Sequence, residues 1–143
     1  MKNYKDFNLR KNMIHQPPML MVDEILCENS MSGKTLFRVH KDCIFLNSRG
    51  VLQRTAMIEI AAQSFAAIDI FQKKEKGLKY SKGFIAGIRD FQFFSDAKID
   101  DEIICNTEKI DELGQLYITK ADLINKKTGE VLAKGEIRIY EML

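Results

Sequence analysis

The sequence has few of the features that mark metal sites, membrane proteins or secreted domains. Its 143 residues include only two histidines and three cysteines, and the cysteines lack the spacing of metal ligands. We therefore expect no metal site, and an odd, scattered cysteine set is typical of reduced thiols in a cytoplasmic protein. No apolar run approaches the roughly 20 residues of a membrane helix. The polar first twelve residues do not resemble a secretory signal, so we expect no membrane partner.

A strong charge of either sign is also missing. The net charge is +2 with 29% charged residues, and 45% of the chain is hydrophobic. This balance predicts no nucleic-acid partner, and the length fits one globular domain over residues 1–143. One local run is basic: Lys73, Lys74, Lys76, Lys79 and Lys82. It is either a solvated helix end, which suits the helix dipole, or a landing patch for an acidic carrier protein or a phosphate.

Proline and glycine are absent from Val51 to Lys74, and apolar residues recur there at helical spacing. This pattern predicts one long helix. Its middle, Ala56 to Phe71, is apolar on almost every side. A helix that is apolar all round is buried all round, which in a chain this small requires a sheet curled around it.

The remaining segments supply that sheet. After a short helical turn at Asp6–Asn12 and the break at Pro17-Pro18, the apolar patterning and the turn residues predict six strands. The expected class is α+β, an antiparallel sheet of about six strands around one central helix. The expected strands are Met19–Cys27, Lys34–His40, Gly83–Phe94, Asp101–Ile110, Leu116–Asn125 and Glu130–Tyr140.

Glu59 is the first candidate for chemistry, because it is a charged residue in the most apolar stretch of the chain. Burial of an unpaired carboxylate is costly enough to require a partner or a raised pKa. Gln63 lies one helical turn later on the same face and is placed to hydrogen-bond it. The alternative is an acid near the helix start that reaches water or caps backbone donors.

His15 is the second candidate, since imidazole is the side chain best matched to proton transfer near neutral pH and two prolines follow it closely. The alternative is a histidine that only hydrogen-bonds the backbone of the following turn. His40 ends a predicted strand and is expected to be an ordinary surface or edge residue.

The loop before the helix, Phe45–Gly50, offers a further group of candidates. Asn47 or Ser48 is placed to cap the helix or form a turn, and Asn47 is also placed to orient a substrate. The free amides of the first helical turn are expected to hold a thioester carbonyl as charge develops on its oxygen. The candidate substrate-binding residues are Asn47, Gly50, Met57 and Gln63. Met57 is expected to line either a tunnel or the core.

Three motifs resemble bacterial 3-hydroxyacyl-ACP dehydratases. Ile14–Asp23 reads IHQPPMLMVD and is similar to their opening Pro-His-x-x-Pro-Phe/Met-Leu-Leu-Val/Ile-Asp. Met57–Gln63 reads MIEIAAQ and is similar to their helix motif Ile-Glu-x-x-Ala-Gln. Gly83–Phe93, GFIAGIRDFQF, resembles the strand that follows. The motifs stand in the family's order.

This resemblance implies a hotdog fold whose sheet continues into a second subunit, with active sites at the dimer interface. Gly83–Phe94 is our candidate for the subunit junction. The resemblance also implies a hydro-lyase that uses no cofactor and takes an acyl carrier protein or acyl-CoA thioester. By this analogy His15 removes the α-proton as the base, Glu59 protonates the departing hydroxyl as the acid, and a 2-enoyl thioester forms.

The sequence departs from the best-known branch of that family. That branch carries its catalytic histidine in a Gly-His-Phe-Pro-Gly loop before the helix, where this chain reads FLNSRGVL from Phe45 to Leu52. The loop instead resembles the Phe-Leu-Asn-x-x-Gly-x-Leu of a divergent dehydratase-like branch associated with aryl polyene-type gene clusters. Two alternatives stay open. One is a hotdog thioesterase with Glu59 as general base on water, and the other is a non-catalytic subunit that binds an acyl carrier or an active partner.

Overall fold

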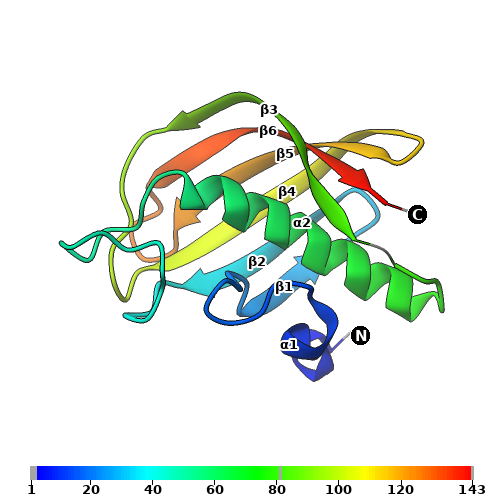
Figure 1. The fold of residues 1–143 in the computed structure, drawn as a ribbon, viewed down its shortest axis with the longest axis horizontal. Helices are drawn as coiled ribbons and strands as arrows, with labels where there is room; N and C mark the ends of the chain where they lie inside the picture. The colour runs from blue at the N-terminus through cyan, green and yellow to red at the C-terminus, as the bar shows by residue number, and fades with distance from the viewer. Residues whose placement is uncertain (1–2, 81, 143) are drawn as a thin grey trace.

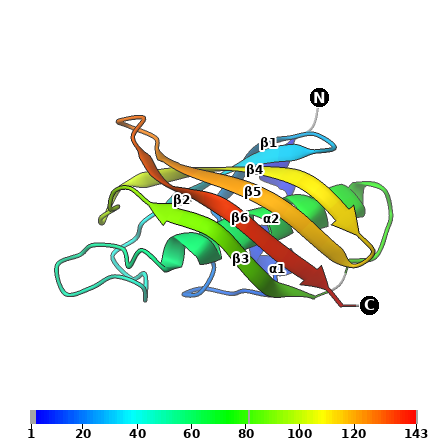
Figure 2. The ribbon, with the colours of Figure 1, turned by 90° about the horizontal axis from the view of Figure 1, so that it is seen from above.

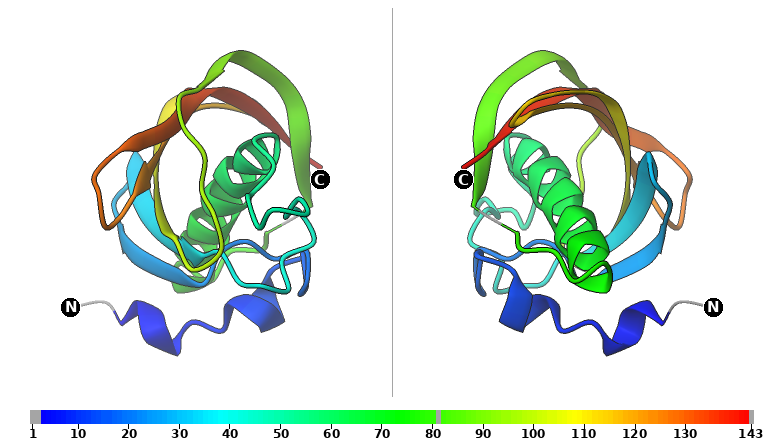
Figure 3. Two further views of the ribbon diagram at one scale, coloured as in Figure 1. Left: turned by 90° about the vertical axis from the view of Figure 1, so that its left-hand side faces the viewer. Right: turned by 90° about the vertical axis from the view of Figure 1, so that its right-hand side faces the viewer.

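The computed structural model describes residues 3–80 and 82–142, which form one antiparallel sheet wrapped around a long helix (Figure 1). The strand order is β1-β2-β4-β5-β6-β3, and every neighbouring pair is antiparallel. Figure 2 and Figure 3 show the sheet curving over the helix. The predicted α+β architecture is confirmed. The strands are β1 Glu24–Glu28, β2 Ser32–Arg38, β3 Gly83–Phe93, β4 Glu102–Leu113, β5 Leu116–Asn125 and β6 Val131–Glu141.

Helix α2, Ala56–Glu75, is the predicted central helix. No residue from Ala56 to Lys73 is fully exposed, as expected for a helix that is apolar all round. The helix begins five residues later than the expected Val51, because Val51 and Leu52 make isolated bridges to Lys98 and Leu46 and belong to the loop.

The main core fills the space between α2 and the concave face of the sheet. Residues from the helix interdigitate with the inward-facing positions of β4, β5 and β6. Each fully buried leucine or isoleucine contributes about 1.5–3 kcal/mol through removal of its surface from water. The largest fully buried members of this core include Met57, Ile60, Ile103, Leu123, Leu132 and Ile137.

An N-terminal arm, residues 3–22, covers one side of α2 (Figure 3). It contains a 3-10 turn, Tyr4–Asp6, and the short helix α1, Leu9–Asn12, in the region where the sequence predicted a helical turn. The arm packs on the C-terminal half of α2 through a second buried cluster. That cluster is formed by Leu9, Met13, Val22, Ile25, Ala67, Ile68, Ile70 and Phe71.

Two strand boundaries differ from the sequence prediction by three residues or more, each for a physical reason. β2 lies two residues earlier than predicted at both ends, and the remaining differences are of one residue. β1 begins at Glu24 and not at Met19, because the amide of Met19 bonds back to Gln16 in the turn that contains Pro17-Pro18. β4 continues to Leu113, three residues beyond the predicted end. Gly114, at φ +62°, makes this possible by closing a two-residue hairpin to β5.

Strand β3 forms one edge of the sheet and pairs only with β6. Two irregularities interrupt its register, and Phe84 and Ile88 are each about half exposed. Among the described residues, no helix is long and apolar enough to cross a membrane.

Candidate active site

His15 and Glu59 lie in direct contact. His15 Nε2 is 3.2 Å from Glu59 Oε1, although the residues come from the N-terminal arm and the first turn of α2. The two side chains are 35% and 29% exposed, so the pair is sheltered but still open to solvent on one side. The structure thus brings together the two residues that the sequence proposed as acid and base.

The surroundings of Glu59 favour its ionised form. The hydrogen bond with His15 is the main cause that lowers the pKa of Glu59 below its ordinary value of 4.5. Burial alone would raise that pKa, and a hydrogen bond from Gln63 adds to the lowering. Glu59 therefore rests as a carboxylate that accepts hydrogen bonds from both neighbours.

Gln63 is fully buried and joins the helix to the arm. Its side-chain oxygen accepts a hydrogen bond from the amide of Met21 at 2.6 Å, and its Nε2 donates to the carbonyl of Met19 at 3.0 Å. The same Nε2 is 3.4 Å from Glu59 Oε1, as the helical spacing predicted. Gln63 holds Glu59 in place and fixes the segment that follows His15.

The loop before α2 is built around Asn47. Its side-chain oxygen accepts hydrogen bonds from the amides of Arg49 and Val51, and Gly50 adopts φ +74° in the same turn. The N-cap of α2 is Thr55, so the prediction that Asn47 or Ser48 caps the helix is wrong, while the turn role weighed for Asn47 is present. Contact of Asn47 or Gly50 with a substrate stays a prediction.

The expectation that free amides of the first helical turn would hold a carbonyl is also wrong. The amides of Ala56, Met57 and Ile58 donate to carbonyls three residues earlier, at 3.0–3.1 Å. The amides of the first turn of α2 are thus used in bonds of the 3-10 type, from each residue to the residue three before it. The side chain of Met57 is fully buried in the main core, and its contact with a substrate stays a prediction.

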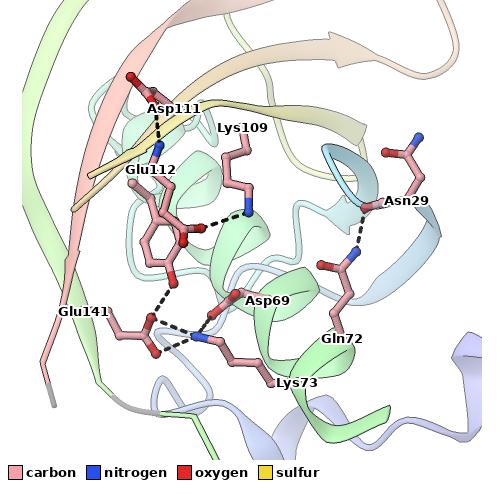
Figure 4. A network of polar contacts seen from close by, with 9 residues as sticks. Asn29, Asp69, Gln72, Lys73, Lys109, Asp111, Glu112 and Glu141 are labelled. Carbon is pink, nitrogen blue, oxygen red and sulfur yellow. Dashed lines mark hydrogen bonds and ion pairs between the residues drawn. The ribbon is translucent and has the colours of Figure 1, made fainter. Parts of the chain in front are cut away.

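A polar network that sequence reasoning missed lies at the other end of α2 (Figure 4). Lys73 Nζ is 2.9 Å from Asp69 and 2.6 Å from Glu141 on β6, and the Tyr117 hydroxyl donates to Glu141 at 2.8 Å. Lys73 is therefore not part of the solvated lysine run in which the sequence placed it. The i, i+4 spacing of Asp69 and Lys73 within an apolar helix was the available signal.

Burial shifts the ionisation of this network. Desolvation raises the pKa of Asp69 despite its bond to Lys73, and it raises the pKa of Tyr117 to about 12. Burial alone would lower the pKa of Lys73, but the bonds to Glu141 and Asp69 outweigh it and raise that pKa. The network clamps the last turn of α2 to the end of the sheet.

The other histidine lies elsewhere. A groove of about 1040 Å³ is lined by Pro17, Pro18 and His40, but by neither member of the His15–Glu59 pair. His40 Nε2 is 3.7 Å from Asp23 Oδ2, and His40 is exposed at the end of β2, as the sequence predicted. Within the described part of the chain, no group of three metal-binding side chains comes together.

Solved structures share this architecture. A chain of the dehydratase heterocomplex ApeI:P from Xenorhabdus doucetiae aligns with a TM-score of 0.83 at 18% identity, covering 90% of this chain and 87% of that one. A hypothetical thioesterase from Streptococcus pneumoniae TIGR4, solved with coenzyme A, aligns with a TM-score of 0.64 at 14% identity, covering 83% and 84%. Escherichia coli PaaI aligns with 0.65 at 11% identity, covering 85% and 80%. The hotdog fold is confirmed.

The sequence comparisons are more specific about the family. No curated protein matches the chain. A family model described as ApeP dehydratase, of the ApeP-like family, matches residues 7–142, which is almost the whole chain. This match confirms the resemblance to the divergent dehydratase-like branch. The chain belongs to the ApeP-like dehydratase family.

Proposed function

We propose that this protein is a hydro-lyase that converts 3-hydroxyacyl thioesters into 2-enoyl thioesters at the His15–Glu59 pair. The observation that carries the proposal is the 3.2 Å contact between His15 Nε2 and Glu59 Oε1. Dehydration needs one group to take the α-proton and another to protonate the leaving hydroxyl, and an imidazole beside a carboxyl group can do both. Membership of the ApeP-like family supports this reaction class.

In the proposed cycle His15 removes the α-proton, and protonated Glu59 gives its proton to the hydroxyl, which leaves as water. The electrons of the broken C–H bond form the new double bond. The pair then holds an imidazolium and a carboxylate, and their direct contact lets the proton return from His15 to Glu59. The site is thereby reset without a cofactor.

The resting carboxylate of Glu59 must gain a proton before it acts as the acid. Its pKa is lowered by the His15 hydrogen bond, while burial acts in the opposite direction. A bound acyl chain would exclude more water from the half-open pair and strengthen the burial contribution. We propose that substrate binding raises the pKa of Glu59 in this way and so favours its protonated form.

We further propose that the protein works as a homodimer through the edge of β3. This strand has no partner on its outer side among the described residues and exposes Phe84 and Ile88. A second copy pairing there would cover this apolar surface and satisfy the edge hydrogen-bonding groups. The thioester is carried by an acyl carrier protein or by coenzyme A.

The test is an assay of enoyl formation from 3-hydroxyacyl thioesters of a purified acyl carrier protein, with free thiol followed in parallel. We expect wild-type protein to form the enoyl product. His15→Ala and Glu59→Gln should each reduce the rate by at least about 100-fold, the usual contribution of a general acid or base. His40→Ala is the matched control, since His40 lies outside the pair, and should retain the rate.

The same assay separates a second candidate function. The ionised state of Glu59 also suits a general base that activates water, as a thioesterase requires. Release of free thiol without enoyl product, lost in Glu59→Gln, would replace the dehydratase proposal with hydrolysis. Folded wild-type protein that forms neither product would replace both with a non-catalytic acyl-carrier-binding or partner subunit.

A further inference from the structure

The N-terminal arm and the end of α2 together form a strongly basic surface. Residues 3–12 and 74–82 contribute seven lysines and arginines against two acids, Asp6 and Glu75. All seven cations are exposed. The basic surface, as we call it, consists of Lys5, Arg10, Lys11, Lys74, Lys76, Lys79 and Lys82.

Packing brings these two segments together although more than 60 residues separate them. The hydroxyl of Tyr80 donates to the side chain of Asn12 at 3.3 Å. The rings of Tyr4 and Phe7 lie 5.1 and 5.3 Å from the ring of Phe71 on α2. Figure 1 and Figure 3 show the arm passing beneath the C-terminal half of the helix.

Among residues 3–80 and 82–142, no ion pair neutralises the charge of this surface. None of the seven cations lies within 4.0 Å of a carboxylate of residues 3–80 or 82–142. The whole chain has a net charge of only +2, so the rest of it carries more acids than bases. The excess of basic residues is therefore confined to these two segments and does not reflect a generally basic protein. Lys73, buried in its own ion pairs, takes no part in it.

We infer that the basic surface is the docking site for an acidic carrier protein that delivers the acyl thioester. This inference rests on the proposed function. Complementary charges would steer the carrier and fix its orientation, and exposed Leu78 among the lysines offers an apolar contact to a partner helix.

The position of the surface relative to the catalytic pair supports a carrier with a long arm. Lys74 lies 15 residues beyond Glu59 on α2, which is about 22 Å along the helix. Arg10 and Lys11 belong to the same arm that carries His15. A carrier docked at the basic surface would therefore need an extended tether for its acyl group to reach the His15–Glu59 pair.

The test compares charge-reversed variants on two substrates with the same acyl group. Lys74→Glu/Lys79→Glu should raise KM for the 3-hydroxybutyryl thioester of an acidic acyl carrier protein roughly tenfold at low salt, with kcat unchanged. KM for the 3-hydroxybutyryl thioester of N-acetylcysteamine should not change. Lys126→Glu/Lys127→Glu, with the same change in net charge on two exposed residues of the turn between β5 and β6, is the matched control and should leave both values unchanged.

Binding of the holo carrier protein without an acyl group, measured by fluorescence anisotropy, tests the inference independently of any reaction. We expect Lys74→Glu/Lys79→Glu and Arg10→Glu/Lys11→Glu each to weaken binding about tenfold, and added salt to reduce the difference. Equal binding by these variants and the control would overturn the inference. Tighter binding of wild-type protein to phosphatidylglycerol vesicles or to RNA than to the carrier would also overturn it. Carrier binding without turnover would retain the docking site and reject the proposed dehydration.

Discussion

At the scale of single residues, Gln63 shows why the His15–Glu59 pair exists. The amide is fully buried, and its three polar contacts go to Met19, Met21 and Glu59. Two of those contacts are to backbone groups of the segment that follows His15. The side chain of Gln63 thus contacts both the carboxylate of Glu59 on the helix and the arm that carries the imidazole of His15.

Gln63→Met should therefore disturb both stability and catalysis. The substitution keeps the volume but removes the partner of the buried amide of Met21 and of the partly buried carbonyl of Met19. We expect a loss of about 2–4 kcal/mol in the free energy of unfolding, measured by urea denaturation. Enoyl formation should fall at least tenfold as the arm shifts. Gln53→Met, on an exposed glutamine just before the helix, should change neither, and equal effects of the two substitutions would refute this role for Gln63.

Part of this site was predictable from residue types alone. The helical spacing of Glu59 and Gln63 predicted their contact, and a charged residue in an apolar stretch marked Glu59. The burial of Gln63 and its two backbone partners were not predictable, because they depend on where the turn at Pro17-Pro18 sends the chain. The use of the first-turn amides by a 3-10 turn likewise follows from loop geometry and not from residue type.

At the scale of elements, the apolar character of α2 was enough to predict the sheet around it. The bounds of the strands were predictable to within a few residues in most cases, and β5 begins and ends at the predicted residues. The start of β1 was not, because an apolar run such as Met19–Val22 has the same composition whether it pairs in a sheet or packs beside a helix.

The attachment of the edge strand β3 depends on one glycine of β6. Gly135 lies against the backbone and ring of Phe91, and a Cβ there would overlap them. Gly135→Ala should force β3 away from β6 and reduce the free energy of unfolding by about 1–3 kcal/mol. Gly87→Ala is the control on β3, since its Cβ would make an ordinary 3.6 Å contact with Arg138. Chemical denaturation of both variants measures this, and equal stability would contradict the role of Gly135.

The clamp at the end of α2 should be sensitive to pH. Lys73→Met removes the cation that bonds to the partly buried carboxylates of Asp69 and Glu141. We expect a loss of about 2–4 kcal/mol near pH 7. Burial already raises the pKa of Asp69, and a folded-state pKa above the unfolded value destabilises the fold only above the unfolded pKa. The loss should therefore shrink as the pH falls toward 4.

Thermal melting of wild type and Lys73→Met at pH 7 and pH 4 measures this difference. Lys74→Met changes an exposed neighbour on the same helix and should have no effect on the melting temperature at either pH. A difference between wild type and Lys73→Met that is the same at both pH values would show that lost packing, and not charge, accounts for the effect.

At the scale of the whole molecule, the two faces of the protein differ in what they offer a partner. The basic surface is charged and lies at the end of α2, whereas the β3 edge is apolar. The proposed homodimer uses the edge. Ile88→Lys places a charge on that edge, where Ile88 is 50% exposed, and should convert the dimer into a folded monomer.

Light scattering after size-exclusion chromatography measures the mass of this variant. Ile110→Lys, on β4 and 42% exposed, is the control and should retain the wild-type mass. A dimer that persists in Ile88→Lys would place the subunit junction elsewhere.

The N-terminal arm is attached to the rest of the protein by fewer backbone hydrogen bonds than the strands, and this affects how the protein unfolds on warming. The strands are joined by backbone ladders. In the arm, by contrast, the amide of Met21 and the carbonyl of Met19 bond to one side chain, Gln63, and the amides of Met19 and Leu20 bond to Gln16 in their own turn. Segments with few backbone ties open at lower free energy than the sheet that supports them. We therefore expect the arm that carries His15 to open at a lower temperature than the sheet and α2, which carries Glu59. Warming would then separate the two halves of the site while the sheet and α2 remain folded.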